Sequence, residues 1–156
     1  MAGIQDYAPD GPYGGNGGSA YDARDNEHKI QRIETWEAAW QGQNPVLGAI
    51  KFQFDDDTCS GRVGGNDPQI DYYPKTPFVF EDGEKIDSMT VYSGDFINGF
   101  KFHTTRNNEF QVGGTDGPND VQNLGNGEWA GATGRDNIHG ADAVVDSMIL
   151  YFNDKI

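Results

Sequence analysis

The chain has a single cysteine, Cys59, among 156 residues. One thiol excludes an internal disulfide framework and a cysteine-based zinc cluster. It leaves the redox compartment open, because a lone thiol fits a cytosolic chain as well as a bridge between two secreted chains. Cys59 has polar neighbours and follows an acidic run, so we expect an accessible loop thiol and, in an oxidising compartment, an intermolecular disulfide.

Long apolar runs and basic residues are also scarce. No stretch approaches the roughly eighteen apolar residues that a membrane span needs, so we expect no membrane insertion. The first residues show neither the basic nor the apolar segment of a signal peptide. Only 11 Lys and Arg accompany 25 Asp and Glu, which gives a formal net charge of −14. Such an acidic chain is not expected to bind nucleic acid.

Glycine and aromatic residues are abundant instead. The sequence contains 22 Gly and 7 Pro, together with 9 Phe, 7 Tyr and 3 Trp. Many glycines indicate many turns and few long helices, and the aromatic residues argue against disorder. The length fits a single domain over residues 1–156, with residues 1–10 as an extended N-terminal segment. We expect a soluble, loop-rich, all-β domain, with Trp36, Trp40 and Trp129 as core candidates.

Three short segments share one pattern along the chain: residues 45–52, 96–102 and 143–150. Each has two apolar residues, two small or polar positions and then an alternating apolar run. An apolar partner segment precedes each of them, at residues 29–33, 85–89 and 129–132. The first two modules also close alike, on Val63-Gly64-Gly65 and Val112-Gly113-Gly114. Several echoes in the same order indicate a threefold internal repeat.

The repeat predicts the architecture. Four short strands cannot bury their apolar face alone, so three antiparallel four-stranded sheets are expected to enclose a shared core. The third module lacks a closing strand, which residues 1–25 are expected to supply. Residues 27–41 carry apolar residues at helical intervals, but Ile30 and Ile33 align with Ile86 and Met89 of a strand-like segment. We therefore predict a strand there as well.

At this point the residues resemble the jacalin-related lectins. The stretch Gly11-Pro12-Tyr13-Gly14-Gly15 is similar to the opening of that family, and residues 145–152 are similar to its final strand. The resemblance covers roughly residues 11–153. It implies a β-prism of three Greek-key sheets and reversible sugar binding at one end of the prism, without metal, cofactor or catalysis. It also makes mannose or glucose the default sugar, a homodimer the default assembly and secretion the favoured localisation, with the cytoplasm as the alternative.

The resemblance also implies a binding site. Gly18 corresponds to the glycine whose backbone contacts the sugar, and Asp146 to the aspartate that ends the Gly-x-x-x-Asp loop of the family and accepts hydrogen bonds from two hydroxyls. Backbone N–H groups are expected from Ala143, Val144 and Val145. Asp142 stands where the family has glycine, so it could narrow the pocket, add an acceptor or abolish binding. Gly140 could serve instead in an enlarged loop.

Loops of the other two modules differ from this pattern. Gly94, Asp95, Phe96 and Asn98 form a Gly-x-x-x-Asn variant, which we treat as a second candidate site. Residues 44–48 offer no acceptor at the last position and a proline in the middle, so we expect no sugar there.

Two alternatives remain open on the residues alone. Asp55-Asp56-Asp57 and the overall charge would suit an acidic extracellular matrix or mineral-associated protein that attracts calcium, although no EF-hand spacing is present. A glycosidase needs two carboxylates roughly 5 to 10 Å apart, which 25 acids provide by chance. His28, His103 and His139 lie far apart in sequence and no nucleophile motif is present. We therefore expect no enzyme.

Overall fold

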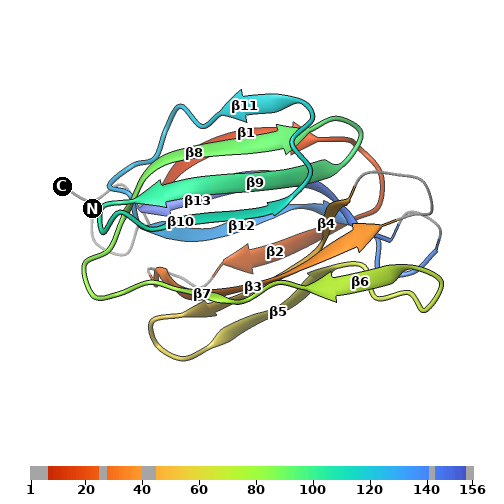
Figure 1. Cartoon of the computed structure of the whole chain (residues 1–156), viewed down its shortest axis with the longest axis horizontal. Coiled ribbons are helices and arrows are strands. Elements are labelled where there is room, and N and C mark those ends of the chain that lie inside the picture. Colours follow the sequence, from red (N-terminus) through yellow and green to blue (C-terminus); the bar gives the residue numbers. More distant parts are fainter. Residues whose placement is uncertain (1–6, 25–27, 40–44, 141–142, 154–156) are drawn as a thin grey trace.

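The structure is a computed structural model that describes residues 7–24, 28–39, 45–140 and 143–153. These residues form thirteen β-strands and, within the described ranges, no helix. Accordingly, the described part of the chain contains no helix that is long and apolar enough to span a membrane. The strands of three sheets run along the long axis of the molecule (Figure 1).

Each sheet is antiparallel and is built around four strands. The first sheet has the order β5 (Cys59–Gly64), β4 (Val46–Phe54), β3 (Ile30–Ala39) and β6 (Asp71–Pro74), and the short β7 (Phe78–Val79) also pairs with β3. The second sheet has the order β10 (Glu109–Gly113), β9 (Ile97–Thr104), β8 (Ile86–Ser93) and β11 (Pro118–Asp120). The third has the order β1 (Tyr7–Gly14), β13 (Val145–Asn153), β12 (Trp129–Asp136) and β2 (Ser19–Arg24).

The N-terminal segment closes the ring as predicted, since β1 pairs with β13 at one edge of the third sheet. It also supplies β2, which pairs with β12 at the other edge. The predicted threefold all-β architecture is therefore confirmed, with β4, β9 and β13 as the equivalent central strands.

The inner faces of the three sheets meet at Trp129, which is fully buried. Its ring lies 5.1 Å from Phe52 of the first sheet and 5.6 Å from Phe100 of the second, both edge-on, and 6.3 Å from Phe152 of its own sheet. Its indole N–H donates to the Gly131 carbonyl at 2.9 Å. One residue thus joins all three sheets, which explains how strands that are short individually share one core.

Residues 30–39 form a strand, as the alignment predicted, and the structure shows why their pattern looks helical. Between Ile30 and Arg32 the pairing with β4 shifts by one residue, which is a β-bulge. The extra residue turns both Ile30 and Ile33 inward although they are three positions apart. The same shift between Ile86 and Ser88 brings Ile86 and Met89 inward in the second sheet.

Of the three tryptophans predicted to lie in the core, only Trp129 is confirmed there. Trp36 is only half-buried and lies on the side of β3 opposite the buried Thr35, so it is not a core residue. Trp40 lies outside the described residues.

Candidate functional site

Three Gly-Gly pairs end equivalent edge strands: Gly14-Gly15, Gly64-Gly65 and Gly113-Gly114. In each pair the N–H of the second glycine donates to a carbonyl at the start of the equivalent central strand, at 2.9, 2.8 and 2.8 Å; the acceptors are Asp146, Gly48 and Asn98. The repeat therefore places Asp146, Gly48 and Asn98 at equivalent positions, in agreement with the sequence alignment of the three modules.

These glycines are required by close backbone approach. The first glycine of each pair has a φ of 100, 103 or 79°, and a Cβ atom there would lie 2.1 to 2.4 Å from a backbone oxygen of the adjacent strand. The second glycine abuts a loop of a different sheet. A Cβ on Gly15 would meet the Asp95 carbonyl at 2.3 Å, and one on Gly65 would meet the Ala143 carbonyl at 1.7 Å. The pairs therefore bring loops of different sheets together at one end of the prism.

Asp146 lies at the centre of this end. It is the second residue of β13 and is only 1% exposed. The Asn137 amide donates to its Oδ2 atom at 3.2 Å, and a Cβ on Gly17 would lie 2.6 Å from the same oxygen. Asp146 is therefore a buried acid rather than an exposed residue at the end of a loop, because residues of the glycine-rich segment (residues 14–18) and of the β12–β13 loop cover it.

Gly17 and Gly18 contact different parts of this site, and the predicted contact of Gly18 with a sugar stays a prediction. Gly18 packs against the backbone of Asp136, since a Cβ there would lie 2.3 Å from its carbonyl oxygen. Gly17 is the glycine that contacts the Asp146 carboxylate. Arg135 holds both glycines: its Nε donates to the Gly17 carbonyl at 3.1 Å, and its Nη2 donates to the Gly18 carbonyl.

The β12–β13 loop is held from the first sheet. Asp67 accepts a hydrogen bond from the Gly140 N–H at 2.6 Å, and the Asn66 N–H donates to the Ile138 carbonyl at 2.8 Å. Tyr72 OH donates to the Ala143 carbonyl at 2.6 Å. The backbone N–H groups of Gly140 and then Gln69 hold the pKa of Asp67 below its usual range. Asp67 is therefore an ionised anchor for the loop.

The predicted backbone donors lie in this region as well. Ala143, Val144 and Val145 are all fully buried, and the Val144 carbonyl accepts a hydrogen bond from the Asn137 N–H at 3.1 Å. Asp142 lies outside the described residues. The role of these residues in sugar binding therefore stays a prediction.

The second candidate site is assembled but less enclosed. Gly94 N–H donates to the Phe96 carbonyl at 3.0 Å, and Asn98 Nδ2 donates to the Asp116 carbonyl at 3.0 Å. Asp95 is exposed, and its backbone packs against Gly15. The glycine-rich segment thus lies between the two candidate sites. In the first module, Gly48 takes the equivalent position and has no side chain to accept a hydroxyl.

Other polar clusters have ordinary structural explanations. His28 Nδ1 lies 2.7 Å from Asp55 Oδ1, and its Nε2 lies 3.5 Å from Asp56 Oδ2. One ring nitrogen of His28 and one carboxylate oxygen from each of the two aspartates lie within 4.8 Å of one another. This group lies where β4 ends in the hairpin to β5, and Asp56 also accepts hydrogen bonds from Thr58 of the same turn. Cys59, the first residue of β5, is exposed as predicted, although it lies in a strand.

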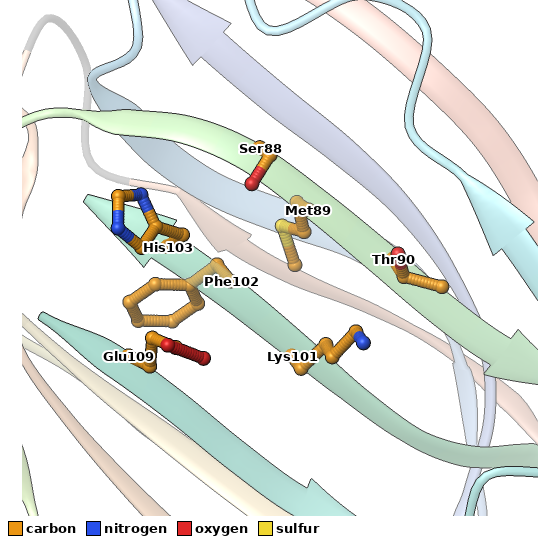
Figure 2. Close-up of a pocket in the computed structure, with 7 residues that line it drawn as sticks. All are labelled: Ser88, Met89, Thr90, Lys101, Phe102, His103 and Glu109. Carbon is orange, nitrogen blue, oxygen red and sulfur yellow. The ribbon is translucent and has the colours of Figure 1, made fainter. Parts of the chain in front are cut away.

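A shallow hollow of about 140 Å³ lies on the outer face of the second sheet, beside Ser88, Thr90, Lys101, His103 and Glu109 (Figure 2). Hydrogen bonds to Asn107 and Asp87 raise the pKa of His103. Ligand sites usually enclose at least about 300 Å³, so this hollow is small for a sugar.

Comparison with known proteins agrees with the fold. The Jacalin-like lectin domain family matches residues 10–145. Among curated proteins, none matches the sequence. The lamprey immune protein shares 23% identity with a TM-score of 0.72, and the alignment covers 98% of this chain and 46% of that protein. This chain therefore spans less than half of the length of the lamprey protein.

Two lectins match over nearly their whole length. Calsepa lectin, solved in complex with a bisected glycan, shares 22% identity over 96% of this chain and 99% of its own, with a TM-score of 0.71. A mannose-binding jacalin-related lectin from Ananas comosus shares 19% over 94% and 98%, with a TM-score of 0.64. Identities this low establish the fold alone. The family match over residues 10–145 establishes the membership: the chain belongs to the jacalin-like lectin domain family, which binds carbohydrate and is not enzymatic.

Proposed function

We propose that this domain binds neutral mono- or oligosaccharides reversibly and without metal, at the end of the prism where Asp146 lies. The observation that carries the proposal is the position of the Asp146 carboxylate. It lies between the Asn137 amide and the backbone of Gly17, at the point where three segments distant in sequence converge.

The chemistry follows from what a neutral sugar offers, which is hydroxyl groups and C–H faces. A carboxylate accepts hydrogen bonds from two neighbouring hydroxyls, and each such charge-assisted bond contributes about 1.5 to 3 kcal/mol where water is excluded. Asn137 now donates to Asp146, so a sugar hydroxyl takes over the role of this amide when it binds. Because Gly17 covers the carboxylate, binding also includes a displacement of the glycine-rich segment. Backbone N–H groups near Val144 and Val145, with the backbone of Gly17 and Gly18, complete the site.

The finer assignments are part of the same proposal. The sugar is of the mannose or glucose type, and the mannose-binding lectin from Ananas comosus supports mannose. Gly94, Asp95, Phe96 and Asn98 form a second, weaker site, in which an amide replaces the carboxylate. The edge strands of three sheets support assembly as a homodimer. We propose secretion as the localisation, which the exposed Cys59 would permit as a disulfide between two chains.

The test is a glycan-array screen of the protein with and without EDTA, followed by titration of the best ligand. Asp146→Asn keeps the size of the side chain and removes its charge, so we expect affinity to fall at least about tenfold. Asp82→Asn is the matched control, because Asp82 is exposed and distant in sequence from the site. Circular dichroism and the melting temperature verify that each variant is folded.

Several outcomes would count against the proposal. Unchanged affinity in Asp146→Asn would show that the sugar binds elsewhere. Glycan binding that disappears in EDTA would contradict metal independence. An array without hits, together with calcium uptake at millimolar concentration, would favour the acidic matrix alternative.

A further inference from the structure

A second hollow, of about 340 Å³, lies on the first sheet, at the end of the prism where Asp146 lies. Its walls include Trp36 of β3, Arg62 of β5 and Tyr72 of β6, with Pro68 and Pro74 at its sides. This volume falls in the range of small-molecule sites, and aromatic rings and prolines provide apolar surface for the C–H face of a sugar ring. The hollow is separate from Asp146, although Asp67 lines it and also anchors the β12–β13 loop.

Arg62 is the distinctive group in this hollow. Its guanidinium carbon lies 4.4 Å from the centre of the Trp36 ring and 5.1 Å from that of Tyr72. Its Nε and Nη2 atoms both donate to the Gly65 carbonyl, at 3.0 and 2.7 Å. The guanidinium is therefore fixed by two ring contacts and two hydrogen bonds, which is the kind of preorganisation that a binding site needs.

The hydrogen bonds to Gly65 use one edge of the guanidinium. A guanidinium has five N–H groups and two edges that can pair with both oxygens of a carboxylate, so the Nη1–Nη2 edge is the one that remains. Among the described residues, no acceptor meets this edge and no carboxylate lies within ion-pair distance of Arg62. Burial, moreover, lowers the pKa of Arg62, and an anionic partner would offset the cost of that burial.

The neighbouring acid does not supply that partner. The two oxygens of Asp67 accept the Gly140 and Gln69 N–H groups at 2.6 and 2.8 Å. Both carboxylate oxygens of Asp67 are therefore hydrogen-bonded to backbone N–H groups, whereas Arg62 has N–H groups left that can donate to a ligand.

We propose that the hollow at Trp36, Arg62 and Tyr72 is a second saccharide site that binds a carboxylate-bearing sugar, such as a uronic acid residue, through the Nη1–Nη2 edge of Arg62. This goes beyond the proposed function, in which Asp146 accepts hydrogen bonds from neutral sugars. A carboxylate acceptor selects hydroxyl donors, and an arginine selects an acidic group, so the two sites distinguish different residues of a glycan.

The test compares methyl β-glucuronide with methyl β-glucoside, which differ only in the carboxylate. Titrations are run on the full chain carrying Asp146→Ala, so that the neutral site is removed, and at constant ionic strength because a single charge pair is screened by salt. We expect the glucuronide to bind at least about tenfold more tightly than the glucoside. Adding Arg62→Gln should abolish that preference. Arg32→Gln is the matched control and should preserve it, because Arg32 pairs with Glu34 and does not line the hollow.

Sodium acetate and sodium sulfate separate a sugar site from a general anion site. If acetate binds as tightly as the glucuronide, the assignment to a saccharide is overturned. Equal affinity for glucuronide and glucoside, or a preference that survives Arg62→Gln, overturns the role of Arg62. If Arg62→Gln does not fold, the indole N–H signal of Trp36 in the unsubstituted protein decides, since it should shift with the glucuronide and not with the glucoside. Loss of neutral-sugar binding in Asp146→Ala leaves this test unaffected, so the two proposals fail independently.

Discussion

Replacing Gly17 by alanine tests the geometry of the carbohydrate site most directly. The added Cβ atom would lie 2.6 Å from Asp146 Oδ2, whereas ordinary van der Waals contact begins at 3.4 Å. The carboxylate therefore has to move by about 0.8 Å, the difference between these two distances. Asp146 is 1% exposed and accepts a hydrogen bond from Asn137, so it has little room to do so.

The expected cost follows from measurements on overpacked interiors, where an inserted methyl group destabilises by about 1 to 3 kcal/mol. For a domain of this size, each kcal/mol lowers the melting temperature by about 2 to 4 °C. We therefore expect the melting temperature of Gly17→Ala to fall by about 2 to 12 °C. Glycan affinity should fall at least about tenfold, because the methyl group enlarges the cover over the acceptor that binding has to displace.

Two variants make this prediction specific. Gly94→Ala is the control for stability alone, because Gly94 belongs to the second candidate site; its Cβ would have its nearest neighbour at 3.9 Å and should change stability by less than about 0.5 kcal/mol. In the double variant Gly17→Ala with Asp146→Ala, the clash is removed, so the two stability changes should not add. Thermal unfolding by circular dichroism and titration of the array ligand give both quantities. A melting temperature of Gly17→Ala equal to that of the unsubstituted protein would refute the described contact.

Three further predictions concern other parts of the molecule. Arg135→Ala should speed amide hydrogen exchange at residues 17–18 while changing the melting temperature little, because the arginine is exposed; unchanged exchange would show that it does not hold the segment. Asp67 should contribute stability above about pH 5 that is lost as the pH falls through its lowered pKa, so Asp67→Asn should flatten the acid limb of the stability profile. Cys59 should give a dimer band on a non-reducing gel of protein from its native source, and identical mobility under both conditions would exclude the bridge.

Much of the fold could be predicted because each copy of the repeat is encoded by a continuous stretch of sequence. Each module carries its own strand pair and its own glycine turn, so the comparison of three segments revealed a pattern that one segment conceals. Ile30 and Ile33 illustrate this, since their spacing alone indicates a helix. The bulge that explains the spacing also occurs at Ile86 and Met89, where the sequence context indicates a strand.

Residues that hold the site could not be predicted in the same way. Arg135 reaches Gly17 across 118 positions and Asp67 reaches Gly140 across 73, and neither pairing leaves a local pattern. The contact between Gly17 and the Asp146 carboxylate was missed for a related reason, because a run of glycines has no side chains to set its register. The burial of Asp146 depends on segments from both ends of the chain, so the strand pattern around it gave no indication of its depth.

The glycine-rich segment limits how this site can open. Two contacts hold Gly15 in place. Its N–H donates to the Asp146 carbonyl at 2.9 Å, and its Cα packs against the Asp95 backbone. In the proposed mode of binding, the displacement that uncovers the Asp146 carboxylate therefore involves residues 16–18, which follow Gly15 and precede β2. Arg135 donates hydrogen bonds to the carbonyls of the last two of these residues, so these bonds oppose that displacement. The proposal thus gives Arg135 a part in access to the acceptor.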